Sequence, residues 1–592
     1  MRPVHGAASS DARHTGVGLP AEAATLRAAM TMMTADTTCR LTADASARPA
    51  SPRVLVFRSC RLPQFTATIA WIRAHWPSAA IDVVTSPGFD EPLRDAGVAR
   101  TFVYDGPAFG LLRHARLVRR LRAERFDHVV IPQANDVAEL HANLYRAARA
   151  IGAGRFVVAA PETAPVVLEP EAFGRLTLLA SLGRVLDVVD VPFFLAQLVV
   201  AWLRPRAVLV PGRARRRVLH VISSLGVGGA QVQLAELLSR TDPAVFDVDV
   251  FVLGRQDGEF SRQWLTRDDV TFHYASAWPR RSQVVFEIAR LCRRKRYDLV
   301  HTWLFMANVV GAAGARLGGA PRLIGSVRNL SLWKRTWYAQ WWFRAADALA
   351  TRLADRVTVN ATPLVADHAA WTWFPPDRLT VVHNGLDPSR VALHGAEARQ
   401  WLRETLHLPP DTPVVGTVGR LAPEKDQAMF VAAVAEACAA RPDLHAVIVG
   451  DGVLRATLEA DVRTRGLTGR VHLLGERRDS RRIIAGLDLF VLTSHIEGFA
   501  NVLLEAAFLG VPAFATRVGG AVDLLHDADL MDCGDASGAA RLMLDRLDRP
   551  DDARRLAEAT RARAFDRFTA SHSAAQWFAL YDQLLSDKGE GQ

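Results

Sequence analysis

Cysteine is scarce in this 592-residue chain, and its five cysteines show no paired spacing. Neither a disulfide framework nor a cysteine-based metal site is predicted, and the pattern fits a cytoplasmic protein. Long apolar runs are also missing. The longest, Val191–Leu203, has thirteen residues, whereas a membrane-spanning helix needs about 20. We therefore expect no transmembrane helix, and a buried or interfacial segment at 191–203.

Lysine is far less common than arginine, and the formal net charge is +10. Three explanations compete for this excess: an arginine-rich genome, an anionic membrane surface and nucleic acid. Because no nucleic-acid-binding motif accompanies the charge, we expect no nucleic-acid partner. The first two explanations stay open, and the second implies peripheral contact with the inner face of a membrane.

The first fifty residues are rich in Ala, Thr and Ser and show no apolar period and no signal-peptide core. We interpret residues 1–51 as a disordered tail. The chain length suggests about three domains at roughly 150 residues each.

Three short apolar runs rich in β-branched residues each precede a loop and a helical pattern. They begin at Arg53, Arg217 and Pro413. Further strand candidates follow each run, so α/β alternation and parallel sheets are expected. These candidates start at Ile81, Phe126, Val248, Asp298, Arg322, Arg356, Ala446, Val471, Leu489 and Ala513.

These patterns predict four segments after the tail. They are an α/β block at 52–170, a helical connection at 171–212, a second α/β block at 213–395 and a third at 396–592. Two adjacent doubly wound domains would bind a ligand between the carboxyl ends of their strands.

The strongest chemical signal is the run from Ser494 to Glu505, which leads from a predicted strand into a helix. The backbone amides of Gly498, Phe499 and Ala500 would lie at the helix N-terminus, which suits a phosphate. Glu497 and Glu505 could bind sugar hydroxyls. The alternative is that Glu497 caps the helix and Glu505 lies on the surface, although a carboxylate in an apolar stretch is costly without a partner.

Two weaker signals follow the first strands of the later blocks. Arg420 and Lys425 flank a turn and suit a diphosphate leaving group without a metal, although a solvated charged loop explains them equally well. Gly228 and Gly229 allow close backbone approach where a helix begins, although such loops also serve as simple turns.

Four motifs in this order resemble the family-4 retaining glycosyltransferases of the GT-B fold. They are the Gly-Gly-Ala loop at 228–230, His-Asn-Gly at 383–385, Gly-Arg-x4-Lys at 419–425 and Glu-x7-Glu at 497–505. The resemblance covers about 217–585. It implies an α/β fold with two facing Rossmann-like doubly wound domains, here accompanied by an additional N-terminal Rossmann-like domain.

The resemblance also implies roles for the matching residues. Arg420 and Lys425 would bind the donor diphosphate, Glu505 the ribose and Glu497 the transferred sugar, while Gly228 and Gly229 would approach the phosphates. The implied reaction is metal-independent front-face transfer from a nucleotide-diphosphate sugar to a lipid-linked or cell-envelope glycan, with no cofactor. Asn384 and Gly385 would shape the turn between the domains.

The chain departs from the family at two places. Arg328, followed by Asn329, stands where many members carry histidine, and Trp303 and Met306 stand where further histidines are common. Arg328 and Asn329 are therefore candidates for a phosphate, sugar or acceptor contact, with an interdomain salt bridge as the alternative for Arg328. His301 is either a site residue or a core histidine.

Two further segments leave alternatives open. The first block weakly resembles the N-terminal half of heptosyltransferase-like proteins, as an accessory domain or a degenerate catalytic half. The aromatic and cationic run Leu332–Arg344 fits either a lipid headgroup zone or a helix packed on the sheet.

Other classes remain to be weighed against a transferase. A sugar-nucleotide epimerase would share the fold, and a non-catalytic sugar- or partner-binding scaffold would tolerate the departures at Arg328 and Met306. The sequence does not identify the donor base and sugar, the acceptor or the oligomeric state.

Overall fold

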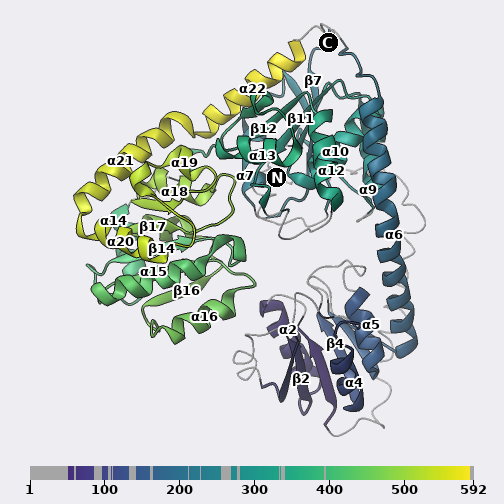
Figure 1. Cartoon of the computed structure of the whole chain (residues 1–592), viewed down its shortest axis with the longest axis vertical. Helices are drawn as coiled ribbons and strands as arrows, with labels where there is room; N and C mark the ends of the chain where they lie inside the picture. Colours follow the sequence, from purple (N-terminus) through teal and green to yellow (C-terminus); the bar gives the residue numbers. More distant parts are fainter. Residues whose placement is uncertain are drawn as a thin grey trace, which may run out of the picture. The chain divides into compact units, whose positions relative to one another are not determined.

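The computed structural model describes residues 51–586 apart from short gaps, and the predicted tail lies outside the described residues. The gaps are 59–61, 86–96, 105–108, 110, 133–141, 160–164, 211, 227, 255–267, 277–279, 333, 335–340 and 392–394. The described residues form three sheets with helices on both faces (Figure 1). The predicted α/β class is therefore confirmed.

The first sheet has the order β3-β2-β1-β4-β5-β6, and its strands are parallel except for β6. Helix α2 covers one face, while α4, α5 and the start of α6 cover the other. The elements are β1 (Arg53–Phe57), α2 (Leu62–His75), β2 (Ala80–Thr85), β3 (Arg100–Val103), α4 (Ala115–Ala123), β4 (Phe126–Pro132), α5 (Ala142–Ile151), β5 (Ala153–Ala159) and β6 (Val166–Leu168).

The second sheet is fully parallel, with the order β13-β12-β11-β10-β7-β8-β9. Its central strands are buried on both faces because helices cover both. The elements are β7 (Arg216–Ile222), α7 (Gly229–Arg240), β8 (Phe246–Val252), β9 (Thr271–Tyr274), α9 (Arg281–Lys295), β10 (Leu299–Trp303), α10 (Phe305–Gly318), β11 (Arg322–Val327), α12 (Trp341–Leu353), β12 (Arg356–Val359), α13 (Pro363–Thr372), η2 (Pro376–Arg378), β13 (Leu379–Val381) and η3 (Pro388–Arg390).

The third sheet is also parallel, with the order β16-β15-β14-β17-β18-β19. In both the second and third sheets the chain returns to the opposite side of the first strand, which is the doubly wound topology. The elements are α14 (Gly395–Thr405), β14 (Val414–Val418), η4 (Pro423–Lys425), α15 (Gln427–Ala440), β15 (His445–Val449), α16 (Arg455–Thr464), β16 (Val471–Gly475), α17 (Ser480–Ala485), β17 (Leu489–Leu492), α18 (Asn501–Leu509), β18 (Ala513–Thr516), α19 (Ala521–Leu524), η5 (Asp527–Asp529), β19 (Leu530–Met531), α20 (Ala536–Asp548), α21 (Pro550–Arg567) and α22 (Ala570–Ser586).

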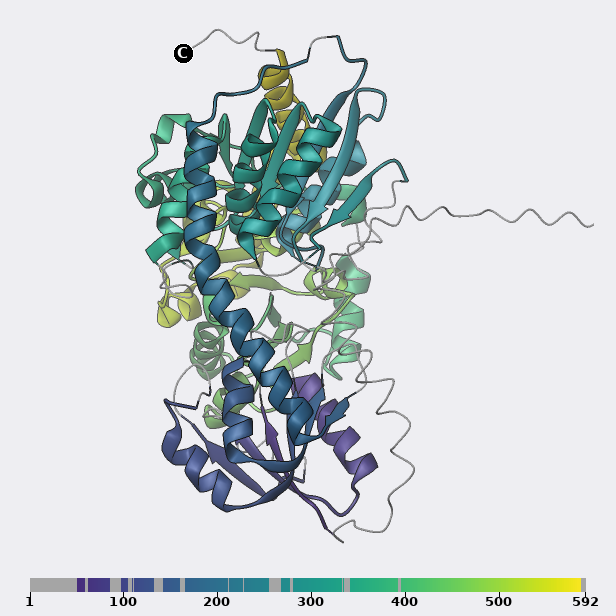
Figure 2. The same cartoon turned by 90° about the vertical axis from the view of Figure 1, so that its right-hand side faces the viewer.

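The connection between the first two sheets is a single helix, α6 (Pro170–Leu203), seen along its length in Figure 2. Phe194 and Leu198 are buried against α9, α10 and α12. Phe193 and Trp202, by contrast, are more than half exposed. The run 191–203 is thus half buried and half solvent-facing, and no described helix is both long and apolar enough to cross a bilayer.

Helix α22 packs against the second sheet, although the predicted boundary at 396 groups it with the third. Trp577, Tyr581 and Leu584 share a core with Val218 and Ile222 of β7. In Figure 1, α22 accordingly lies beside the sheet that contains β11 and β12. The apolar face of α22 completes one side of the second sheet.

The described part of the aromatic run 332–344 supports the packed-helix interpretation. Trp342 and Phe343 are buried in the core beside Phe194 and Phe305. Lys334 is buried and forms an ion pair with Asp347. These aromatic side chains are therefore unavailable to a lipid surface.

Candidate functional site

The predicted phosphate site forms where β17 leads into α18. Glycine is required at 498 because an added Cβ would lie 2.1 Å from the carbonyl oxygen of Arg328 in the second sheet. The carbonyl of Gly498 in turn accepts a hydrogen bond from the Gly520 amide at 2.6 Å. Phe499 and Ala500 are buried, and α18 begins at Asn501. The loop therefore brings the N-terminus of α18 next to the second sheet.

Lys425 and Glu497 meet in this loop as an ion pair. Glu497 is only 8 % exposed, and one of its oxygens also accepts a hydrogen bond from the Ser494 hydroxyl at 2.8 Å. Arg420 pairs with Glu424 and keeps an exposed side chain. The structure thus brings Lys425 and Glu497 into direct contact from positions 72 residues apart.

Glu505 lies in the second turn of α18 and pairs with Arg481 of α17, with Nε and Oε1 3.0 Å apart. Burial raises the pKa of the Glu505 carboxyl, and the Arg481 charge opposes that rise. The apolar stretch around Glu505 therefore has a cationic partner within the protein, which the sequence analysis did not identify.

Gly228 and Gly229 lie at the start of α7, as expected, with Gly228 as the N-cap residue. The side-chain amide of Asn501 donates to the Gly229 carbonyl at 3.4 Å. This contact places the glycine pair opposite the N-terminus of α18. The glycines of the second sheet and the amides of the third therefore meet at one place.

Asn384 and Gly385 join the two sheets here, which is the structural role expected for them. Asn384 donates to the Phe499 carbonyl at 3.1 Å and to Asn501 Oδ1 at 2.7 Å. Gly385 exchanges two hydrogen bonds with the Gln233 side chain, at 2.8 and 2.9 Å. Both side-chain amides therefore fix the turn relative to α7 and α18.

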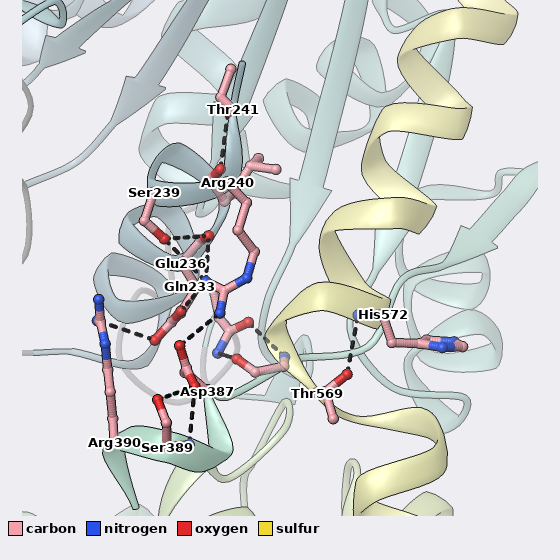
Figure 3. Close-up of polar contacts among 12 residues, drawn as sticks. Gln233, Glu236, Ser239, Arg240, Thr241, Asp387, Ser389, Arg390, Thr569 and His572 are labelled. Carbon is pink, nitrogen blue, oxygen red and sulfur yellow. Dashed lines mark hydrogen bonds and ion pairs between the residues drawn. The ribbon is translucent and has the colours of Figure 1, made fainter. Parts of the chain in front are cut away.

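A second set of contacts holds the other end of α7, as Figure 3 shows. Arg240 pairs with Asp387 at 2.9 Å and also with Glu236, which is buried. Arg390 approaches the same glutamate at 3.4 Å. These ion pairs anchor the helix whose N-terminus carries the glycine pair.

The three remaining candidates differ in their surroundings. His301 is fully buried, and its ring nitrogens are engaged by the Tyr581 and Ser326 hydroxyls at 2.6 and 2.8 Å. Of the two alternatives, the structure therefore favours a core histidine. Asn329 folds back to accept from the Leu330 amide at 2.9 Å. Arg328 contacts Asn384 at 3.3 Å, and no carboxylate among the described residues pairs with it, so the interdomain salt bridge is absent there.

Two residues at this site escaped the sequence analysis. Ser494 orients Glu497, and Arg481 neutralises Glu505. The role of Ser494 could have been predicted from its position three residues before Glu497. The pairing of Arg481 with Glu505 could not, because these residues are 24 positions apart and meet only through the packing of α17 against α18.

Two facing doubly wound domains that meet at a helix N-terminus, with cations and carboxylates beside it, have the GT-B fold. The comparisons with known families agree. The model "Glycosyltransferase Family 4" matches residues 227–390, and the model "Glycosyl transferases group 1" matches residues 399–563. The two ranges together cover more than half of the chain, and the protein is a glycosyltransferase. Both ranges begin after the first sheet.

Relatives with assigned activities also align with part of the chain. The 2-deoxystreptamine glucosyltransferase of Streptomyces kanamyceticus is 29 % identical over 321 residues, which is 50 % of this chain and 81 % of that protein. An Escherichia coli UDP-Gal:alpha-D-GlcNAc-diphosphoundecaprenol alpha-1,3-galactosyltransferase is 28 % identical over 246 residues, 40 % of this chain and 62 % of that protein.

Among solved structures, Anabaena HepE in complex with UDP-glucose aligns with a TM-score of 0.55 and 23 % identity. The alignment covers 62 % of this chain and 99 % of that chain. At this identity the likeness supports the fold alone. It agrees with the two facing Rossmann-like domains expected from the sequence.

Proposed function

We propose that this glycosyltransferase moves a sugar from a nucleotide-diphosphate sugar onto a lipid-linked or cell-envelope glycan, with retention of anomeric configuration and without a metal. The observation that carries the proposal is the Lys425–Glu497 pair beside the N-terminus of α18. A cation and a row of backbone amides at one point suit a departing diphosphate.

The cationic and acidic residues of the site have different proposed roles. Arg420 and Lys425 neutralise the diphosphate as the bond to the sugar breaks, and Glu505 binds ribose hydroxyls. Glu497 orients the transferred sugar, while the backbone amides at 498–500 face the diphosphate. The acceptor hydroxyl attacks from the face that the diphosphate leaves, and its proton passes to the departing diphosphate. The new bond therefore has the configuration of the old one.

The acceptor class rests on the relatives. One acts on a diphosphoundecaprenol-linked sugar, and another, from Corynebacterium glutamicum, is a mannosyltransferase acting on a phosphatidylinositol monomannoside. The latter is 25 % identical over 387 residues, with 62 % of this chain and 95 % of that protein covered. Both of these acceptors are lipid-linked, whereas the 2-deoxystreptamine glucosyltransferase is not named for a lipid, and we propose the lipid-linked class for this chain.

The first test is a donor screen. Purified protein is incubated with UDP-, GDP- and ADP-sugars and membrane lipid extract, and nucleotide release is measured beside Glu505→Ala. We expect release with one donor class and its loss in the variant. If no donor is bound or consumed with any lipid fraction, the proposed transfer is wrong.

Metal independence gives a separate expected result. Because Lys425 and Arg420 supply the positive charge, dialysis against EDTA should leave the transfer rate within about twofold of the untreated enzyme. Adding Mg²⁺ or Mn²⁺ back should have no further effect. A rate that falls after chelation and returns with one of these ions would show that the metal-free reaction is wrong.

We also propose that α6 lies against an anionic membrane surface. Half of the exposed large apolar side chains in the described part of the chain belong to this helix. Those at helical spacing form what we term the α6 stripe: Leu178, Leu182, Val185, Val189, Phe193, Val200 and Leu203. At 1.5 Å per residue the stripe runs for about 38 Å, long enough to mark an interaction surface.

Charge favours a lipid surface as the partner of the α6 stripe. Arg175, Arg204 and Arg206 are exposed near its two ends. Asp190 of α6 is buried, whereas Glu169 and Glu171 are exposed beside Arg175, so the unbalanced positive charge lies at the carboxyl-terminal end of the stripe. An exposed apolar face with flanking arginines suits the interface of an anionic bilayer.

Vesicle flotation tests this surface. Exchanging Val189 and Phe193 for serine should reduce binding to vesicles containing 30 % anionic lipid by about tenfold or more, because apolar area is lost from the contact. Phe565→Ser on α21 is the matched control, because Phe565 is 45 % exposed. Unchanged flotation, or a dimer that the serine variant breaks, would show that lipid is the wrong partner.

A further inference from the structure

Arg328 follows β11 at the carboxyl end of the second sheet, where its main chain meets the third. Its carbonyl oxygen packs against Gly498, and its Nη1 donates to Asn384 Oδ1 at 3.3 Å. Asn384 in turn contacts Asn501, the first residue of α18. One side-chain amide therefore separates the guanidinium group from the candidate phosphate site.

The guanidinium group is fixed in a defined orientation. It lies over the ring of Trp303, with Cζ 4.6 Å from the ring centroid, and Trp303 is fully buried. The indole nitrogen of Trp303 donates to His220 at 3.1 Å, which holds the ring in place. Stacking on a fixed ring and a hydrogen bond at one corner leave the group little rotational freedom.

Two nitrogens of Arg328, Nε and Nη2, are buried and have no hydrogen-bond partner among the described residues. These two nitrogens form one edge of the guanidinium plane, from which their N–H bonds point in parallel. Such an edge matches two oxygens of a carboxylate or phosphate group. Leaving charged donors buried without partners is costly, so the arrangement favours a ligand that engages both.

The other cations of the site already have carboxylate partners. Lys425 pairs with Glu497, Arg420 with Glu424 and Arg481 with Glu505. Arg328 has none among the described residues, and burial lowers the pKa of its guanidinium group. Positive charge without a counter-ion is therefore concentrated at Arg328.

We propose that the Nε–Nη2 edge of Arg328 binds, side-on, a pair of oxyanion oxygens carried by the sugar donor. The oxygens belong either to a carboxylate on the transferred sugar, as in a uronic acid, or to the donor diphosphate. This inference rests on the proposed function and adds to it a residue that selects the donor.

The affinities for three probes distinguish a sugar carboxylate from the donor diphosphate as the group bound by Arg328. Dissociation constants of UDP, UDP-glucose and UDP-glucuronate are measured by calorimetry for the wild-type protein and for Arg328→Lys, which keeps a positive charge but loses the two-pronged edge. If the diphosphate is bound, all three affinities should fall by about 10- to 100-fold. If a sugar carboxylate is bound, only the affinity for UDP-glucuronate should fall by this factor.

Arg344→Lys is the matched control. Arg344 also stacks on a tryptophan ring, with Cζ 3.7 Å from the centroid of Trp373, and it bonds to main-chain carbonyls outside the site. Its exchange should leave all three affinities unchanged. Arg328→Gln, which keeps one donor but no charge, provides a second variant if the lysine protein does not fold.

The two possible failures are distinct. If a folded Arg328 variant binds all three probes within twofold of the wild-type affinities, the proposed role of Arg328 is wrong. If the wild-type protein binds none of the three, the GDP and ADP series replace them. Absence of binding in every series would contradict the proposed function instead.

Discussion

Replacing Lys425 with alanine is expected to lower kcat for sugar transfer by about 10²- to 10³-fold, the usual loss when one charge-stabilising donor is removed from a site. Its Nζ is held by Glu497, and its carbonyl accepts from Thr493 at 3.1 Å, so its position is fixed before the diphosphate departs. The measurement is steady-state nucleotide release with the donor found in the screen.

Two further variants separate loss of chemistry from loss of folding. Lys425→Ala alone leaves the buried Glu497 without its ion-pair partner, whereas Lys425→Ala combined with Glu497→Gln removes that carboxylate as well. We expect the double variant to regain thermal stability and to stay inactive. Arg465→Ala, which removes an exposed ion pair with Asp461 in the same domain, should retain full activity. Recovery of activity in the double variant would contradict a role for Lys425 in transfer.

Acidification from pH 7 to pH 5 is expected to destabilise the domain built on the second sheet strongly, because three neutral histidines lie in its core: His220, His301 and His368, whose pKa burial lowers to about 4. Burial lowers the pKa of His220 to about 3, and the pKa of the fully buried His301 is also well below its usual value. When the folded pKa is depressed, stability is present above the unfolded pKa of about 6.5 and is lost as the pH falls below it. Each histidine then loses about 1.4 kcal/mol per pH unit.

Together the three histidines would remove about 6 kcal/mol at pH 5, or roughly 15 °C in Tm for a domain of this size. The test compares Tm at pH 7 and pH 5 for wild-type protein and for His220→Asn, which keeps an acceptor for the Trp303 indole. The Tm of the variant should fall by about a third less on acidification than the Tm of the wild-type protein. An identical fall in both proteins would show that these histidines do not control the acid response.

Much of the fold could be predicted because buried parallel strands are continuous apolar runs. The runs at Arg53, Arg217 and Pro413 became β1, β7 and β14, the strands at which each sheet reverses its order. Most edge strands were missed, although the edge strand β16 was predicted at Val471. β9, for example, has no fully buried residue, so its sequence lacks the apolar signal.

Within the site, local motifs placed Lys425, Glu497 and the glycine pair correctly relative to strands and helices. The partners of these residues were harder to predict from the sequence, because they come from distant elements. The free edge of Arg328 depends on a tryptophan in the neighbouring strand and on an amide 56 residues later. The core position of His301 depends on Tyr581, 280 residues away.

The return of α22 to the second sheet has a consequence for biosynthesis. The side of β7 that Trp577 and Tyr581 cover stays open until residues 570–586 leave the ribosome, after the whole third domain has been made. The second domain therefore cannot complete its folding in the order of translation. The third domain can reach its native state first, and the emerging helix α22 then completes the second domain in a late step.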